Sequence, residues 1–127
     1  MWYAKMYFSG EREFFENDAF GMQGLCYNGN HPHPEEEDDQ LHFVSREELL
    51  ANADVISLHC PLTEETDQMI CKDSIAKMKQ GVIIINTARG RIINDLDLAN
   101  ALASGKVGYA ASMVHPGDRV RFEIDLV

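Results

Sequence analysis

Residues 82–85, which read Val-Ile-Ile-Ile, constrain the fold of this chain more than any other stretch. Four consecutive β-branched apolar residues predict a strand that is buried on both faces, as in the middle of a parallel sheet. Gly81 and Gly90 lie on either side of the stretch, where turn residues are expected. The chain is therefore predicted to build its core around this strand.

The polar residues that follow this strand form a candidate site. Asn86, Thr87 and Arg89 all carry side chains that donate hydrogen bonds, and open parallel sheets bind ligands just beyond the carboxyl ends of their strands. Arginine presents a planar fork of donors that matches a carboxylate or a phosphate. A polar turn with a solvated arginine would explain the same residues, so this stretch alone leaves both interpretations open.

Strand and helix patterns alternate regularly between residues 41 and 114. Such alternation predicts βαβ units and an α/β fold with a doubly wound parallel sheet. The predicted strands are 41–44, 54–59, 82–85 and 107–114. Predicted helices begin at a capping box of Ser45 and Glu48, at Asp73 (continuing to Met78, with Gly81 as the C-terminal glycine), and at Asn94 or Asp95. The last helix is predicted to end at Gly105 and to bury Leu96, Leu98, Ala99 and Leu102.

The two ends of the chain are predicted from shorter patterns. A strand is expected within residues 1–8, a helix over 11–20, and a second strand at 23–27 that runs into an irregular segment rich in glycine and proline. The tail 119–127 alternates charged and apolar residues, which predicts a half-buried edge strand with Val120, Phe122, Ile124 and Leu126 on one face. No repeat or linker divides the chain, so residues 1–127 are predicted to form a single domain.

Composition excludes several classes of function. A formal net charge of −10 disfavours nucleic acid as a partner, and no apolar stretch approaches the roughly 18–20 residues that span a bilayer. Three widely spaced cysteines predict reduced thiols in a cytoplasmic protein rather than a disulfide frame or a zinc site. His31 and His33 have no third ligand at a metal-binding spacing, so no metal site is predicted.

Several sequence motifs in order resemble one known family. They are residues 53–63 (ADVISLHCPLT) with Thr66, 78–81 (MKQG), 85–90 (INTARG), 101–102 (AL) and 104–106 (SGK), and residues 19–22 (AFGM) fit the same pattern. Together they resemble the nucleotide-binding domain of the D-isomer-specific 2-hydroxyacid dehydrogenases, chiefly over residues 40–114. The resemblance implies a Rossmann-like sheet, incomplete at the N-terminus, with atypical ends at 1–22 and 115–127.

The resemblance also implies a site for NAD and for a small 2-hydroxy or 2-keto acid. Arg89 matches the arginine that grips the substrate, and a guanidinium fork can hold the two adjacent oxygens of such an acid. The cofactor itself supplies the redox chemistry. Residues implied on the adenosine side are Cys60, Pro61 and Thr66, and those implied near the nicotinamide are Thr87, Ala88 and Arg89.

The sequence departs from the family pattern where the cofactor's phosphates and ribose should bind. The family's G-x-G-x-x-G turn is expected near residues 1–10, which contain a single glycine, and no G-x-G occurs anywhere in the chain. The ribose-binding acid of the family falls at Asn28. Asparagine can still bond a ribose but does not repel a 2′-phosphate, so NADP is a possible alternative to NAD.

The catalytic acids of the family find at best one match, at Asp118. The expected aspartate falls on Ser112 or Met113, and the glutamate falls on Gly117 or Asp118. His115 lies too early to be the catalytic histidine, which is expected beyond the last residue. Because proton delivery needs that histidine, the chain is predicted not to turn over a 2-hydroxy acid alone, and either a homodimer or a missing partner domain is expected to cover its apolar surface.

Three interpretations therefore remain open from the sequence. The chain can be the cofactor-binding part of a dehydrogenase, or a non-catalytic module that keeps the fold and binds a nucleotide or a protein. It can also be a remnant whose ends come from unrelated coding sequence.

Overall fold

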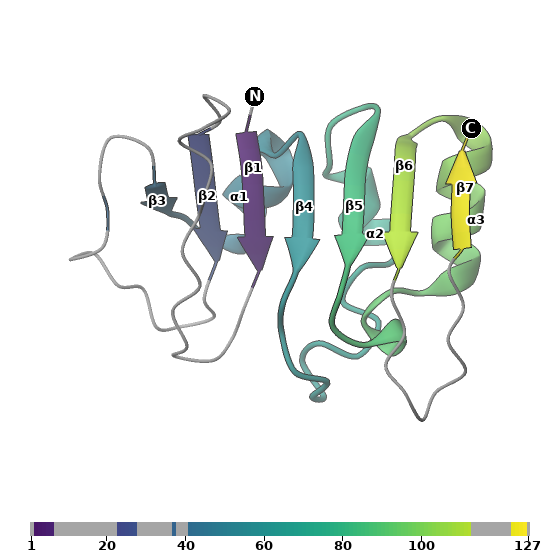
Figure 1. The fold of residues 1–127 in the computed structure, drawn as a ribbon, viewed down its shortest axis with the longest axis horizontal. Coiled ribbons are helices and arrows are strands. Elements are labelled where there is room, and N and C mark those ends of the chain that lie inside the picture. The colour runs from purple at the N-terminus through teal and green to yellow at the C-terminus, as the bar shows by residue number, and fades with distance from the viewer. Residues whose placement is uncertain (1, 7–22, 28–36, 38–40, 113–122, 127) are drawn as a thin grey trace.

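In the part of the chain that the structure describes, seven strands form one sheet, and three α-helices pack against it (Figure 1). The computed structural model describes residues 2–6, 23–27, 37, 41–112 and 123–126. In chain order the elements are β1 (Trp2–Met6), β2 (Gln23–Tyr27), β3 (Leu41–Phe43), α1 (Arg46–Asn52), β4 (Val55–Leu58), α2 (Lys72–Ala76), β5 (Val82–Asn86), the short 3-10 helix η3 (Gly90–Ile92), α3 (Asp95–Ser104), β6 (Val107–Ser112) and β7 (Glu123–Leu126).

The strand order is β3-β2-β1-β4-β5-β6-β7. Every pair from β3 to β6 is parallel, and β7 adds to the edge antiparallel to β6. The chain runs outward from β1 to β3 and then crosses back to β4, which creates the switch point of a doubly wound sheet between β1 and β4. The predicted Rossmann-like α/β fold and the predicted edge position of the tail strand are confirmed. The helix predicted at 11–20 lies outside the described residues, as do Val120 and Phe122.

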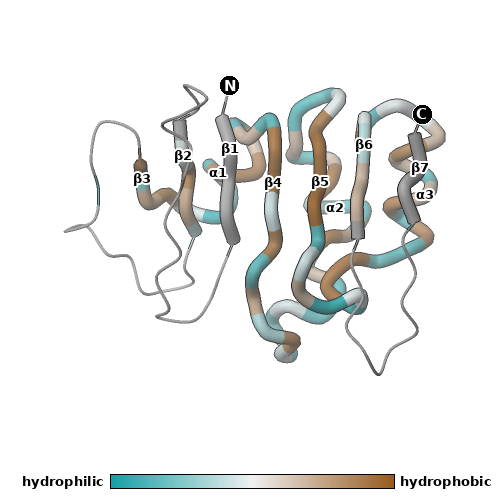
Figure 2. Tube along the Cα trace, viewed as in Figure 1, coloured by the Kyte–Doolittle hydropathy of each residue, from teal (hydrophilic) through white to brown (hydrophobic). Residues whose placement is uncertain are grey.

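The strand β5 lies inside the sheet, parallel to β4 and to β6, as its apolar sequence predicts. Its side chains alternate: Val82, Ile84 and Asn86 are buried, whereas Ile83 and Ile85 are partly exposed. The prediction that both faces are buried is therefore wrong for one face. The helices that the structure describes, α1, α2 and α3, all lie behind the sheet (Figure 1), and Val82 and Ile84 belong to the core that they cover. Figure 2 shows that β5 is hydrophobic along its length and turns hydrophilic at its carboxyl end.

The helix ends follow local hydrogen bonding. Ser45 and Glu48 form the predicted capping box of α1, Asn94 caps α3, and Gly105 ends α3 with φ at 80°. The predicted start of α2 at Asp73 is wrong, because Cys71 is the N-cap and its N–H donates to the Ser74 hydroxyl. This helix also ends at Ala76, two residues before the predicted end.

The buried face of α3 differs from the predicted one. Ala101 and Leu102 are buried and Leu98 packs against the core, but Leu96 is 70% exposed and Ala99 is exposed. Successive residues of a helix are separated by about 100°, so Leu96 lies roughly 200° away from Leu98 and faces the opposite side. Among the described helices, none is long and apolar enough to cross a membrane.

Candidate functional site

Two loops at the carboxyl edge of the sheet carry the predicted site residues that the structure describes. The β4 loop (residues 59–70) follows β4, and the β5 loop (residues 87–94) follows β5. Because β4 and β5 are parallel neighbours, both loops leave the sheet at the same edge, the lower one in Figure 1. This is the edge where open parallel sheets bind ligands.

The β5 loop is held by a buried amide. Asn86 is 1% exposed. Its Nδ2 donates to the carbonyl of Arg89 at 2.8 Å, and its Oδ1 accepts from the Ala88 N–H at 3.0 Å. The Thr87 hydroxyl donates to the Leu58 carbonyl at the end of β4, at 3.4 Å. Sequence reasoning noticed this asparagine as a donor but missed its role, although a side-chain amide that bonds backbone two residues on is a known turn signal.

The held loop presents Arg89 to solvent. Its side chain is exposed, while its carbonyl is fixed by Asn86 and its backbone is extended at the start of η3. In the part of the chain that the structure describes, the guanidinium has neither a hydrogen-bond nor an ion-pair partner. Its donors are therefore free to receive a carboxylate.

A buried hydroxyl holds the β4 loop in the way that the Asn86 amide holds the β5 loop. Thr66 is 0% exposed. Its hydroxyl donates to the Pro61 carbonyl at 2.6 Å and accepts from the Thr63 N–H at 2.7 Å. Because the side chain has no exposed surface, it acts on a ligand only through the shape that it gives to the loop. Pro61 is exposed on that loop.

The start of the β4 loop is buried. Cys60 is 2% exposed, and this burial raises the pKa of its thiol to about 11. The thiol is therefore neutral at physiological pH and is a packing group rather than a nucleophile. Ser57, buried in β4, shares a hydrogen bond of 2.6 Å with His59 Nε2, which links the strand to the first residue of the loop.

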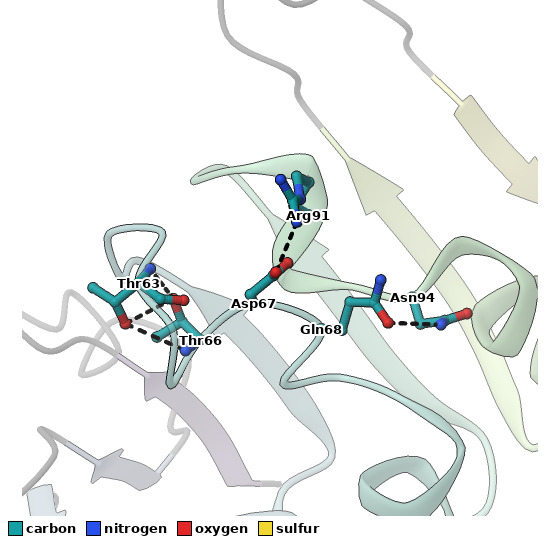
Figure 3. Close-up of polar contacts among 6 residues, drawn as sticks. All are labelled: Thr63, Thr66, Asp67, Gln68, Arg91 and Asn94. Atoms are coloured by element: carbon teal, nitrogen blue, oxygen red, sulfur yellow. Dashed lines mark hydrogen bonds and ion pairs between the residues drawn. The ribbon is translucent and has the colours of Figure 1, made fainter.

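The two loops are also joined to each other (Figure 3). Their backbones pair over three hydrogen bonds, and two side-chain contacts lie beside them. The backbone bonds run from Gln68 N–H to Arg91 C=O (2.7 Å), from Ile70 N–H to Ile92 C=O (3.0 Å) and from Asn94 N–H to Ile70 C=O (2.8 Å). The side-chain contacts are Arg91 Nη2 to Asp67 Oδ2 (2.8 Å) and Asn94 Nδ2 to Gln68 Oε1 (3.1 Å).

The residues at this edge suit part of a dinucleotide better than the whole. The described loops offer an exposed wall at Pro61 and free donors at Arg89. The family's phosphate turn would follow β1, beside the switch point, yet residues 7–12 read Tyr-Phe-Ser-Gly-Glu-Arg, with no second glycine. Asn28 comes directly after β2 but lies outside the described residues.

Comparisons with known proteins identify the family. Residues 13–120 match the model of the D-isomer specific 2-hydroxyacid dehydrogenase, NAD binding domain. A hydroxypyruvate reductase of Blautia hydrogenotrophica is 48% identical over 92 residues, which cover 72% of this chain and 28% of that protein. A human glyoxylate reductase/hydroxypyruvate reductase is 45% identical, with the same shares covered. This chain thus spans less than a third of the length of these relatives.

Solved structures agree with this match. The apo structure of D-lactate dehydrogenase from Escherichia coli superposes with a TM-score of 0.76 at 28% identity, over 92% of this chain and 38% of that one. D-Lactate dehydrogenase from Aquifex aeolicus, complexed with NAD and lactic acid, gives 0.72 at 32% identity, over 88% and 34%. Fold, motifs and matched residues agree that the chain belongs to the D-isomer specific 2-hydroxyacid dehydrogenase family and represents its NAD binding domain.

Proposed function

We propose that this chain is the cofactor-binding part of a dehydrogenase that exchanges a hydride between NAD and a small 2-hydroxy acid or its 2-keto product. One observation carries the proposal: the exposed Arg89 follows β5, with its backbone fixed by the buried Asn86. The relatives named hydroxypyruvate reductase and glyoxylate reductase, and the D-lactate dehydrogenase bound to NAD and lactic acid, support this class of substrate.

In this proposal Arg89 binds the carboxylate of the acid and the neighbouring C2 oxygen. Two parallel N–H donors match two adjacent oxygens, and this geometry orients C2 as well as binding the acid. Because Asn86 holds the Arg89 carbonyl, the side chain starts from a fixed point. NAD, when bound, supplies the hydride chemistry.

The cofactor would lie across both loops. Pro61, on the backbone shaped by Thr66, would flank the adenosine, and we call this part of the β4 loop the adenosine wall. The buried Cys60 would support the adenosine wall from inside the protein. Thr87 and Ala88 would lie near the nicotinamide. Asn28 would bond the ribose, which leaves NADP possible as well as NAD. The absence of a G-x-G pair from the sequence removes the usual backbone cradle for the pyrophosphate, so we expect weak binding.

We also propose what covers the exposed side of the sheet and in which compartment the protein resides. A homodimer or a separate substrate domain would cover the partly exposed side of β5, which carries Ile83 and Ile85. Among the described residues, Cys26, Cys60 and Cys71 form no disulfide bond, which fits a cytoplasmic protein.

The test combines an assay with a titration. The 127-residue chain is incubated with NADH and pyruvate, glyoxylate or hydroxypyruvate, and NADH binding is measured by calorimetry. We expect a weak saturable heat with NADH and no oxidation above background, because no residue of this sequence matches the histidine that would deliver the proton. A chain that gives no heat with NADH contradicts the proposed cofactor site. Turnover that Arg89→Ala abolishes would support the role of Arg89 but contradict the predicted inactivity of the chain alone.

A further inference from the structure

We propose that Asp67, Gln68, Arg91 and Asn94 are positioning residues that fasten the β4 loop to the β5 loop. We call these four residues the loop clamp. The clamp makes the adenosine wall and the acid-binding arginine move as one unit, so that either loop can open only if the other opens too. What this means for ligands rests on the proposed function, whereas the mechanical coupling does not.

Backbone pairing provides the base of the coupling. Ile70 of the β4 loop forms a parallel bridge with Ile93 of the β5 loop, with hydrogen bonds on both sides of it. Ile70 and Ile92 have no exposed surface, and both belong to the main core. The β5 loop therefore cannot shift along the β4 loop without exposing buried isoleucine and breaking backbone hydrogen bonds.

The strained backbone of Gln68 indicates that contacts between the two loops fix its conformation. Its φ is 53°, and it is the one non-glycine residue with positive φ among those described. A left-handed conformation is unfavourable for such a residue and persists only where the surroundings impose it. Here its N–H donates to the Arg91 carbonyl and its side chain accepts from Asn94, so contacts with the β5 loop hold the strained residue.

The side-chain contacts fix the register rather than add much stability. The Asp67–Arg91 pair is largely solvent-exposed at Arg91, and exposed ion pairs contribute little to folding. Asn94 has two roles: its Oδ1 caps α3 at the Asp97 N–H while its Nδ2 donates to Gln68. Since Arg91 lies two residues after Arg89, a movement of Asp67 is transmitted to the site arginine through a short, hydrogen-bonded segment.

Amide hydrogen exchange on the ligand-free chain tests the coupling. The variant is Asp67→Ala with Asn94→Ser; alanine cannot accept from Arg91, and serine keeps the helix cap but cannot reach Gln68. The matched control is Glu64→Ala with Asn52→Ser, which removes an exposed carboxylate from the same loop and an amide that bonds only within α1. The reporter amides are those of Thr66, bonded inside the β4 loop, and Ala88, bonded to Asn86 inside the β5 loop.

We expect both reporter amides to exchange about fivefold faster in the clamp variant than in the control, as the loss of about 1 kcal/mol allows. The denaturant midpoint of global unfolding, measured in parallel, should shift by the same small amount in the clamp variant and in the control. Restoration of the pair in reverse, by Asp67→Arg with Arg91→Asp in the Asn94→Ser background, should slow both amides again. Faster exchange at Thr66 with no change at Ala88, or equal rates in variant and control, would overturn the proposal.

A ligand titration separates this proposal from the proposed function. In the parent chain, adenosine monophosphate should increase the affinity for oxamate, an unreactive analogue of a 2-keto acid, and in the clamp variant this increase should disappear. If oxamate does not bind to the parent chain, the proposed function is contradicted while the exchange rates still decide whether the clamp exists. If adenosine monophosphate increases oxamate affinity equally in both proteins, the clamp does not couple the two loops.

Discussion

The β4 loop and the β5 loop are held by the same kind of buried side chain but carry charges of opposite sign. Each loop is held by one buried polar side chain that bonds two of its backbone groups: Thr66, within the β4 loop, bonds Pro61 and Thr63, and Asn86, at the end of β5, bonds Ala88 and Arg89. The charged residues of the two loops differ in sign. The β4 loop carries Glu64, Glu65 and Asp67, and the β5 loop carries Arg89 and Arg91.

This difference separates the residues that shape a site from those that do its chemistry. The shaping residues are small, polar, buried and fully bonded, so they are expected to affect stability and only indirectly affinity. The charged residues other than the partly buried Asp67 are exposed, so they are expected to affect affinity with little effect on stability. The following predictions test that separation, starting with the largest effect.

Replacing Asn86 with alanine should lower the free energy of unfolding by about 3 kcal/mol, because two partly buried backbone groups lose their partner and a cavity forms. Asn100→Ala, on the exposed side of α3, is the matched control and should change it by less than about 0.5 kcal/mol. Chemical denaturation monitored by circular dichroism measures both. Equal stabilities of the two variants would show that Asn86 is not the support of the β5 loop.

Replacing Thr66 with valine should lower the free energy of unfolding by about 2 kcal/mol. The shape of the side chain is retained, but the Pro61 carbonyl and the Thr63 N–H lose their partner. Thr66→Ser keeps the hydroxyl and should recover more than half of the loss in the same denaturation experiment. If the serine variant is as unstable as the valine variant, packing of the methyl group rather than hydrogen bonding supports this loop.

The thiol at the start of the β4 loop should make stability depend on alkaline pH. The folded-state pKa of Cys60 is raised to about 11 from 9.0, so the unfolded chain loses this proton first as pH rises. Stability should be unaffected by this group below pH 9.0, fall as pH rises towards 11 and be reduced by about 1 kcal/mol at pH 10. Comparing the alkaline slope of Cys60→Ala with that of Cys71→Ala isolates the effect, and equal slopes would contradict it.

Much of the fold could be predicted because local patterns agree with it. The β-branched residues of β5, the capping box at Ser45 and the glycine at Gly105 each determine an element where the structure has it. Two predicted details are wrong. Leu96 lies on the exposed side of α3, as its angular position requires, and α2 is capped by Cys71 rather than by Asp73, although aspartate is a commoner capping residue.

The sequence alone suggests which residues form the candidate site but not the contacts that hold them in place. Motif residues such as Arg89 and Thr66 carry a family resemblance, whereas the sequence does not say that Thr66 is fully buried. The junction between the loops depends on contacts between residues 24 to 26 positions apart, such as Asp67–Arg91 and Gln68–Asn94. No local pattern reports such pairs, because they follow from the parallel register of β4 and β5.

The most direct test of the central claim is a titration of the parent chain, Arg89→Ala and Arg89→Lys with oxamate, followed by two-dimensional NMR. We expect saturable shifts of the Ala88 and Gly90 amides in the parent, at least about tenfold weaker binding in Arg89→Lys, which lacks the fork, and no binding in Arg89→Ala. All three proteins should unfold at the same denaturant concentration, because the guanidinium has no partner among the described residues. Oxamate binding of equal affinity in the parent and in Arg89→Ala would contradict the assignment of Arg89 as the acid-binding residue.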